Sequence, residues 1–169
     1  KYYHDLVLED NQINPFSFLK NLSKLSPPNT TFVCDTGQNL VWSMQAIEIK
    51  KEARLITAWG HSPMGYSICA SMGAAEANLN SKVICIIGDG GLQMNIQELQ
   101  TLKYYNYPIT IFVMNNNSYA CIKDFQNDNL DGRHYATSPE YGYLAPSFTD
   151  IAKSYGIKSF KLSKCDEAE

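Results

Sequence analysis

Hydrophobic residues in this chain fall into two kinds of run, separated by stretches rich in glycine, proline and asparagine. In the first kind nearly every residue is apolar, which is typical of strands buried on both faces of a parallel sheet. In the second kind apolar residues recur every three or four positions, which predicts amphipathic helices. The first pattern predicts strands over residues 82–91 and 107–118. Shorter or mixed runs also predict strands over residues 30–37, 53–59 and 157–162.

The helical pattern lies before and between these predicted strands. The first helix has good start signals, because Asn14 can cap it and Pro15 would occupy its first position. Strands that alternate with helices predict an α/β fold, a doubly wound parallel sheet with helices on both faces. The helices are expected over residues 14–25, 38–49, 64–78, 95–106 and 148–156.

A polar, turn-rich stretch interrupts this alternation over residues 128–147. A compact domain seldom keeps so long a loop without a function. We interpret it as a substrate-selecting loop, with a fully exposed loop tip as the alternative. The sequence ends soon after its last predicted strand, without a helix to close the sheet, so we expect the chain to be a fragment of a larger protein.

Composition narrows the class of protein. With 169 residues, 44% of them hydrophobic, the chain is long enough for one domain with a full core. Its net charge is −3 and its lysines are scattered, which argues against a nucleic-acid partner. Its apolar stretches are far shorter than the roughly 20 residues that a membrane-spanning helix needs. The N-terminus lacks the apolar core of a signal peptide, so we expect no membrane association and a cytoplasmic location.

The five cysteines form no C-x-x-C pair. Cys34, Cys69 and Cys85 lie inside apolar segments, which favours reduced thiols that pack as small hydrophobic side chains over a disulfide framework or a zinc site. Cys121 follows an asparagine-rich turn, and we interpret it as a packing residue rather than a nucleophile.

The stretch "GDGGLQMN" places Asp89 among three glycines at the end of a predicted strand. Gln93 stands where a dinucleotide-binding fingerprint needs its third glycine, so that motif fails. Polar residues 115–118 leave the end of the next strand, and the carboxyl ends of parallel strands open on one edge of a sheet. Carboxylate and amide oxygens suit Mg²⁺, and glycine N–H groups at a helix start suit a phosphate. The pattern therefore predicts a metal-bridged diphosphate.

The same residues resemble the G-D-G…N-N signature of thiamine-diphosphate enzymes, in which an Asp and an Asn hold Mg²⁺ against the diphosphate of the cofactor. Here Asp89 and Asn116 lie 27 positions apart, which is the spacing of that signature. The resemblance implies thiamine diphosphate and Mg²⁺ as cofactors. It also implies that the metal ligands are Asp89, Asn116 and the backbone carbonyl of Ser118.

The resemblance extends to both sides of the signature and is strongest to acetolactate synthases. "DTGQNLVWSMQ" resembles their G-Q-H-Q-M-W-A-A-Q segment, so Gly37, Gln38 and Asn39 are expected to bind the diphosphate. "SPMGYSICASMGAA" resembles G-T-M-G-Y-G-L-P-A-A-I-G-A, so Met64 is expected to hold the cofactor bent and the Ser62 carbonyl to contact its aminopyrimidine. Asn39 replaces a His of the family, and Ser62 replaces a Gly.

Further along, "NNNSYACIKDFQ" resembles N-N-x-x-x-G-M-V-x-Q-W-Q, with Cys121 for the Met and Phe125 for the Trp that face the substrate in the family. His61, in the loop before Met64, is a candidate catalytic residue, with capping of a turn as the alternative. The expected cofactor-binding residues are Gly37, Gln38, Asn39, Ser62, Met64, Gly88, Asp89, Gly90, Gly91, Asn116, Ser118 and Tyr119.

The resemblance implies that residues 1–169 form a single diphosphate-binding domain, the C-terminal piece of a larger multidomain enzyme. That enzyme would decarboxylate a 2-oxo acid and transfer the resulting unit to an acceptor. The activating Glu would come from a pyrimidine-binding domain on another subunit of a homodimer or homotetramer, so we expect the chain alone to be inactive. FAD is possible in the full-length protein.

Other functions stay open at this point. Within the family, the enzyme could be a simple 2-oxo acid decarboxylase. Outside it, the chain could be a flavodoxin-like module that binds a nucleotide or a flavin, or a domain that kept the fold and lost the cofactor. The spacing of Asp89 and Asn116 argues against the flavodoxin-like reading, and the presence of both argues against a lost metal site.

Overall fold

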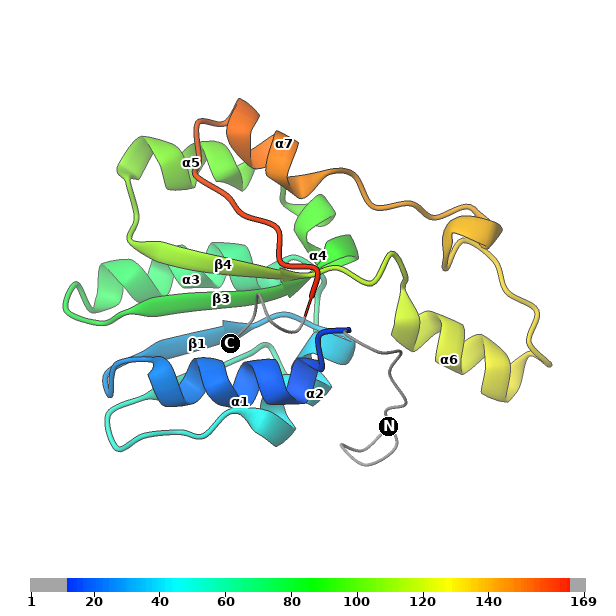
Figure 1. Cartoon of the computed structure of the whole chain (residues 1–169), viewed down its shortest axis with the longest axis horizontal. Coiled ribbons are helices and arrows are strands. Elements are labelled where there is room, and N and C mark those ends of the chain that lie inside the picture. The colour runs from blue at the N-terminus through cyan, green and yellow to red at the C-terminus, as the bar shows by residue number, and fades with distance from the viewer. Residues whose placement is uncertain (1–11, 165–169) are drawn as a thin grey trace.

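A parallel sheet forms the centre of the molecule. The structure is a computed structural model that describes residues 12–164 (Figure 1). Within those residues the sheet has four strands in the order β2-β1-β3-β4, and every neighbouring pair is parallel. The prediction of a parallel α/β sheet is confirmed. Its strands are β1 (Thr31–Cys34), β2 (Arg54–Ile56), β3 (Val83–Gly88) and β4 (Ile109–Met114).

Helices cover both faces of this sheet. On one face, α1 and α2 pack against β1 and β3 (Figure 1). On the other face, α3 packs against β1 and β3, and α4, α5 and α7 join a core with β3 and β4. The doubly wound arrangement predicted from the sequence is therefore present. The helices are α1 (Pro15–Leu25), α2 (Gln38–Ala46), α3 (Tyr66–Ala77), α4 (Asp89–Met94), α5 (Glu98–Tyr105), α6 (Ala120–Asn129) and α7 (Phe148–Ser154), with a short 3-10 helix at Pro139–Tyr141.

Strand β3 shows why the sequence folds in this way. Its side chains alternate between the two faces, so that Ile84 and Ile86 join the core under α1 and α2 while Cys85 and Ile87 join the core under α3, α4 and α5. All four are buried. Complete burial of an isoleucine stabilises a fold by about 1.5–3 kcal/mol. A strand without a polar face is therefore favoured only where helices cover both sides.

The order of the strands creates a crevice at one edge of the sheet. From β1 the chain passes through α2 to β2 on one side, and then crosses back through α3 to β3 on the other side of β1. The loops that leave β1 and β3 consequently turn in opposite directions. In open α/β sheets, ligands bind beyond the carboxyl ends of the strands at such a switch point.

A buried carboxylate holds the elements around this crevice together. Asp35, at the end of β1, is 1% exposed. Its Oδ1 accepts a hydrogen bond from the N–H of Gly65 at 3.0 Å, and its Oδ2 accepts one from the N–H of Ser67 at 2.9 Å. Asp35 thus satisfies the first N–H groups of α3, which has no side-chain cap of its own. A Cβ on Gly91 would lie 2.9 Å from Asp35 Oδ1, so α4 can pack here only with glycine at that position.

The strands are shorter than predicted, and three further differences from the sequence prediction concern β3, α6 and residues 157–162. Strand β3 ends at Gly88 and α4 begins at Asp89, whereas the strand was predicted to continue to residue 91. Helix α6 was not predicted, because its apolar side chains Ile122 and Phe125 are exposed and give no buried stripe. The strand predicted over residues 157–162 is wrong. Apart from the partly buried Ile157, the apolar residues of that segment face solvent, with Phe160 76% exposed, and no burial drives the segment to pair with an edge of the sheet.

The loop over residues 128–147 is exposed at its tip, which contains Arg133 and Tyr135, and is buried in part further along. Thr137, Ser138 and Tyr143 are buried, although Tyr135 is 82% exposed.

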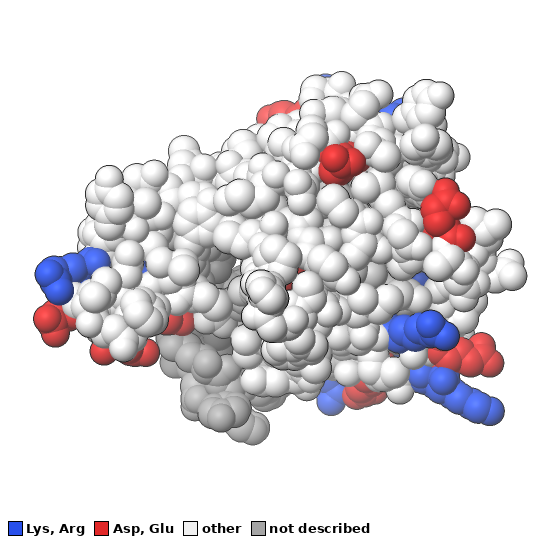
Figure 2. All heavy atoms as spheres, turned by 180° about the vertical axis from the view of Figure 1, so that it is seen from behind, with Lys and Arg blue, Asp and Glu red and all other residues white. Residues whose placement is uncertain are grey.

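On the face opposite to that seen in Figure 1, charged side chains of both signs lie mainly near the outline of the molecule (Figure 2). Among the residues that the structure describes, no helix has the length and apolar character needed to cross a bilayer.

We predict that Asp35→Asn lowers the free energy of unfolding by about 2–3 kcal/mol, because one of the two acceptor oxygens becomes an NH₂ group facing a backbone N–H. Urea unfolding at neutral pH measures the change. The matched control is Asp128→Asn, at an exposed position of α6, where the free energy should stay within about 0.5 kcal/mol of the unsubstituted protein. Equal stability of the two variants would contradict the capping role of Asp35.

Candidate functional site

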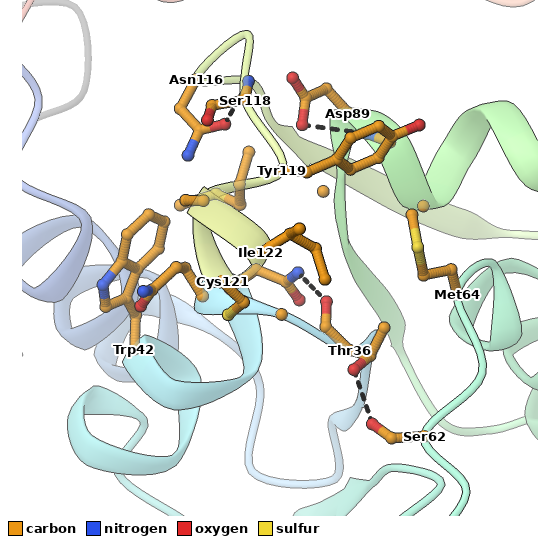
Figure 3. Close-up of a pocket in the computed structure, with 18 residues that line it drawn as sticks. Thr36, Trp42, Ser62, Met64, Asp89, Asn116, Ser118, Tyr119, Cys121 and Ile122 are labelled. Carbon is orange, nitrogen blue, oxygen red and sulfur yellow. Dashed lines mark hydrogen bonds between the residues drawn. The ribbon is translucent and has the colours of Figure 1, made fainter. Parts of the chain in front are cut away.

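A cavity of about 270 Å³ opens at the carboxyl edge of the sheet, at the switch point between β1 and β3 (Figure 3). All twelve residues expected to bind a cofactor line this cavity. His61 does not line it and is exposed, so the structure does not bring this catalytic candidate to the others. The twelve are Gly37, Gln38, Asn39, Ser62, Met64, Gly88, Asp89, Gly90, Gly91, Asn116, Ser118 and Tyr119.

Among the residues that the structure describes, Asp89 is the one acid that lines the cavity, and it is only 3% exposed. Its Oδ1 accepts a hydrogen bond from the N–H of Gly90 at 3.0 Å, whereas its buried Oδ2 has no hydrogen-bond partner within the described residues. Burial raises the pKa of this carboxyl group, against the nearby N–H of Gly90 and hydroxyl of Tyr143, which lower it. A buried carboxylate oxygen without a partner is costly, and a bound cation would offset that cost.

The loop after β4 brings amide oxygens to the same end of the cavity. Asn116 Oδ1 accepts a hydrogen bond from the N–H of Ser118 at 3.0 Å, and Asn115 Oδ1 accepts one from the N–H of Asn117 at 3.0 Å. These two turns curl the backbone tightly, and Asn117 adopts the left-handed conformation with φ of 51°. Asn116 and Ser118 lie across from Asp89 at the top of the cavity (Figure 3).

The donor set at this end is made of oxygens. Within the described residues, no three His, Cys, Asp or Glu side chains gather as a metal site. A cation here would therefore depend on the Asp89 carboxylate, amide oxygens, backbone carbonyls and its own further ligands. Mg²⁺ prefers such hard oxygens and commonly keeps positions for phosphate and water. The residues present fit Mg²⁺ and do not fit a metal that needs nitrogen or sulfur ligands.

The N-terminus of α2 forms the opposite side of the cavity. Gly37 precedes this helix with φ of 98°, and no side chain caps the helix. The first N–H groups of a helix have no partner inside it and favour an anion. Asn39 donates from Nδ2 to the carbonyl of Thr36 at 2.6 Å, and its buried Oδ1 has no hydrogen-bond partner within the described residues. Gln38 donates from Nε2 to Asp124 Oδ2 of α6 at 2.8 Å.

The loop before α3 completes the wall. Ser62 adopts a left-handed conformation with φ of 43°, and its hydroxyl donates to Thr36 Oγ1 at 2.6 Å. Met64 projects into the cavity from this loop, and Trp42 of α2 lies on the opposite side (Figure 3). The cavity is thus polar at the ends of β3 and β4. Large apolar side chains, Met64 from the loop before α3 and Trp42 from α2, line its sides.

A close contact fixes the two loops that leave β3 and β4. A Cβ on Gly90 would lie 2.8 Å from Cδ1 of Tyr119 and would overlap Cε1 of the same ring. Tyr119 in turn packs against Tyr143, with ring centroids 4.1 Å apart. Gly90 is therefore required by the approach of an aromatic ring rather than by a left-handed backbone.

Some lining residues were not predicted from the sequence. Trp42 stands four positions after Gln38 on α2, and helical spacing could have placed both on one face. Thr36 adjoins the predicted turn and belongs to the lining. Tyr143 lies beside the lining rather than in it, comes from the long loop and contacts Gln93 and Tyr119, and no local pattern in the sequence indicates this. Cys121, interpreted as a packing residue, also lines the cavity.

A protein-family model described as "Thiamine pyrophosphate enzyme, C-terminal TPP binding domain" matches residues 35–169. The chain belongs to this family. The match covers every residue of the cavity lining, from Thr36 to Ile122. The resemblance predicted from the sequence is confirmed at the level of the family.

Three acetolactate synthase large subunits illustrate the similarity. That of Buchnera aphidicola subsp. Schlechtendalia chinensis is 35% identical over 159 residues, covering 94% of this chain and 27% of the relative. That of Pyropia yezoensis is 35% identical, covering 92% and 26%. That of Lactococcus lactis subsp. lactis (strain IL1403) is 33% identical, covering 91% and 26%. The chain therefore spans about a quarter of the length of these relatives.

We predict that Gly90→Ala destabilises the protein by about 1–3 kcal/mol, because the added methyl group displaces the ring of Tyr119. Combining it with Tyr119→Ala should cost less than the sum of the two single changes, since the second change removes the atoms that clash. Urea unfolding of the three variants measures the coupling.

The matched control is Gly73→Ala in α3, where an added Cβ meets nothing within 4 Å. This change should stabilise the protein by about 0.5–1 kcal/mol through helix propensity. Additive effects of the changes at positions 90 and 119 would show that the contact does not constrain the site.

Proposed function

We propose that this chain binds the Mg²⁺-diphosphate end of thiamine diphosphate, in an enzyme that decarboxylates a 2-oxo acid and transfers the resulting unit to an acceptor. One observation carries the proposal. A buried carboxylate oxygen of Asp89 lies in the same cavity as the N-terminus of α2, and in the part of the chain that the structure describes neither has a hydrogen-bonding side-chain partner. A site for a cation next to a site for an anion is what a metal-bound diphosphate needs.

The residues divide into two groups under this proposal. Asp89, Asn116 and the carbonyl of Ser118 would hold Mg²⁺, and Gln38 with the first N–H groups of α2 would hold the diphosphate. Gly37 would let the backbone approach the phosphate closely. Larger side chains line the middle of the cavity and would exclude water from the reacting carbon, namely Trp42, Met64, Cys121 and Ile122.

Thiamine diphosphate, when bound, supplies the electron sink for breaking the bond between the carboxylate and the carbonyl carbon of a 2-oxo acid. The described residues of the cavity would bind the cofactor and orient it. Apart from Asp89, no acid and no histidine among them lies in the cavity lining. We therefore propose that the chain is the C-terminal domain of a longer cytoplasmic enzyme. Proton transfer at the aminopyrimidine would depend on a pyrimidine-binding domain, supplied by another subunit of a homo-oligomer.

The similarity to acetolactate synthase large subunits favours transfer to an acceptor over simple decarboxylation. Membership of the thiamine pyrophosphate enzyme family favours thiamine diphosphate over the nucleotide or flavin of a flavodoxin-like module.

We expect calorimetric titration of the full-length protein with thiamine diphosphate to show binding with Mg²⁺ and none with EDTA. Asp89→Asn should weaken this binding on the order of a hundredfold, because it removes the charge that faces the cation. The same change should stabilise the metal-free protein by about 1 kcal/mol, since an unpaired buried carboxylate is no longer present.

Asp128→Asn serves again as the control and should leave both the affinity and the stability unchanged. If neither EDTA nor Asp89→Asn changes the affinity for thiamine diphosphate, the metal-bridged site is ruled out. A stability loss in metal-free Asp89→Asn would mean that the carboxylate is favourably placed without a cation.

Thiol labelling offers a second test, because Cys121 lines the cavity while the exposed Cys69 lies outside it. In a Cys165→Ser background, alkylation of Cys121 should slow when Mg²⁺ and thiamine diphosphate are added, and alkylation of Cys69 should not. Burial raises the pKa of Cys121, so its rate should keep rising with pH above the ordinary range of a thiol.

Cys34 and Cys85 are the internal reference for the labelling. Burial raises their pKa values to about 11 and about 12, and both should stay unlabelled near pH 8. Mass spectrometry of digested protein assigns each site. Equal slowing of Cys69 and Cys121 would indicate a global effect rather than occupation of the cavity.

A further inference from the structure

The side chain of Gln126 joins α6 to the long loop that follows this helix. Of the ten residues of α6, all of which the structure describes, Gln126 is the one that is buried. Its Nε2 donates a hydrogen bond to the carbonyl of Tyr135 at 3.2 Å, and its Oε1 accepts one from the N–H of Tyr135 at 3.2 Å. A side-chain amide that pairs with both polar groups of one residue fixes the position of that residue. Gln126 therefore holds the loop as a neighbouring strand would.

Two residues further along, the same loop contacts the turn that carries Asn116 and Ser118. The carbonyl of Thr137 accepts two hydrogen bonds, one from the N–H of Tyr119 at 3.0 Å and one from the hydroxyl of Ser118 at 2.8 Å. The side chain of Thr137 is 1% exposed, and its hydroxyl donates to Gln126 Oε1 at 3.4 Å. Gln126 and Ser118 thus contact Thr137 from two sides.

The turn carries this contact to the cavity. The N–H of Ser118 donates to Asn116 Oδ1 at 3.0 Å, so the conformation of the turn and the position of the amide oxygen are fixed together. Asn116 and Ser118 lie across from Asp89 (Figure 3). A continuous series of hydrogen bonds therefore runs from Gln126 through Thr137 and Ser118 to Asn116.

We infer that Gln126 is a positioning residue for the cation end of the cavity, because it keeps the long loop docked on the turn of Asn116 and Ser118. The inference rests on the proposed function. Gln126 is not part of the cavity lining, so it would act through the loop and not by contact with a ligand. Partners that orient a metal ligand without touching the metal typically change metal affinity about 10–100-fold when removed. The loop interpreted as substrate-selecting would then also support the cation.

A positioning role differs from simple packing in that it is reciprocal. If docking of the loop favours the cation, the bound cation favours docking of the loop by the same factor. The N–H of Tyr135 reports docking, because Gln126 accepts its hydrogen bond. Tyr135 does not line the cavity, so a ligand there would not shield this N–H directly.

The first measurement is calorimetric titration of the full-length protein with Mg²⁺ at saturating thiamine diphosphate. Gln126→Met keeps a side chain of similar length and removes both its donor and its acceptor. We expect this change to weaken Mg²⁺ binding about tenfold. The matched control is Gln100→Met, at an exposed position of α5, which should leave the affinity unchanged.

The second measurement is hydrogen exchange of the full-length protein, followed by mass spectrometry of the peptide over residues 131–137. Relative to EDTA, Mg²⁺ with thiamine diphosphate should slow exchange of this peptide about tenfold in the unsubstituted protein. In Gln126→Met the peptide should exchange rapidly under both conditions. The peptide over α7, which lies outside the cavity lining, is the internal reference and should not respond to Mg²⁺.

Ser118→Ala interrupts the same series of hydrogen bonds and leaves Gln126 in place. It removes the hydroxyl that reaches Thr137 and keeps the Ser118 carbonyl that is proposed to face the cation. We expect a smaller loss of Mg²⁺ affinity, and less than additive effects with Gln126→Met. If Gln126→Met fails to fold, unchanged Mg²⁺ affinity in Ser118→Ala overturns the inference.

The remaining outcomes are also decisive. Unchanged Mg²⁺ affinity in a folded Gln126→Met overturns the positioning role and leaves the proposed function intact, and so does exchange of residues 131–137 that Mg²⁺ does not slow in the unsubstituted protein. If the unsubstituted protein binds no thiamine diphosphate with Mg²⁺, the proposed function fails and this inference fails with it.

Discussion

The buried pairing of Asp35 with the start of α3 is the interaction on which the arrangement of the site depends. Asp35 directly follows β1, Gly65 and Ser67 lie at the start of α3, which crosses over β1, and the two hydrogen bonds join these segments at one point. Gly91 packs against the same carboxylate, which fixes where α4 can start. A single side chain thereby sets the separation between the loops after β1 and β3, and that separation is the cavity.

Two of the helices that begin at this edge, α2 and α3, use their N-termini differently. In α3 a carboxylate of the protein already satisfies the first N–H groups, whereas α2 has no such cap and its first residues line the cavity. Because an uncapped helix start attracts an anion, the fold distinguishes a structural terminus from one available to a ligand. Asp35 therefore helps to locate the site, because the helix start that it caps is not available to an anion and the start of α2 is.

The helical cover on both faces of the sheet and most of the polar cavity lining follow from features that are local in the sequence. The apolar run of β3 requires helices on both faces, and the acid and amides at the ends of β3 and β4 must meet because parallel strands end together. Three features could not be predicted. Helix α6 shows no buried apolar stripe, the segment at 157–162 has the alternation of a strand but nothing to bury it against, and Tyr143 reaches Gln93 across 50 positions.

The hydrogen bond from Gln38 to Asp124 has a consequence for how a bound molecule leaves. Helix α6 buries one residue, Gln126, so little burial opposes its local release. Its bond to Gln38 joins α6 to the start of α2, on the far side of the cavity. Opening the cavity on the side of the sheet would require cooperative unfolding of the sheet and its covering helices. Opening it on the side of α6 requires only that this one helix detaches. The residence time of a ligand in this cavity should therefore be set by the lifetime of α6 in its docked position.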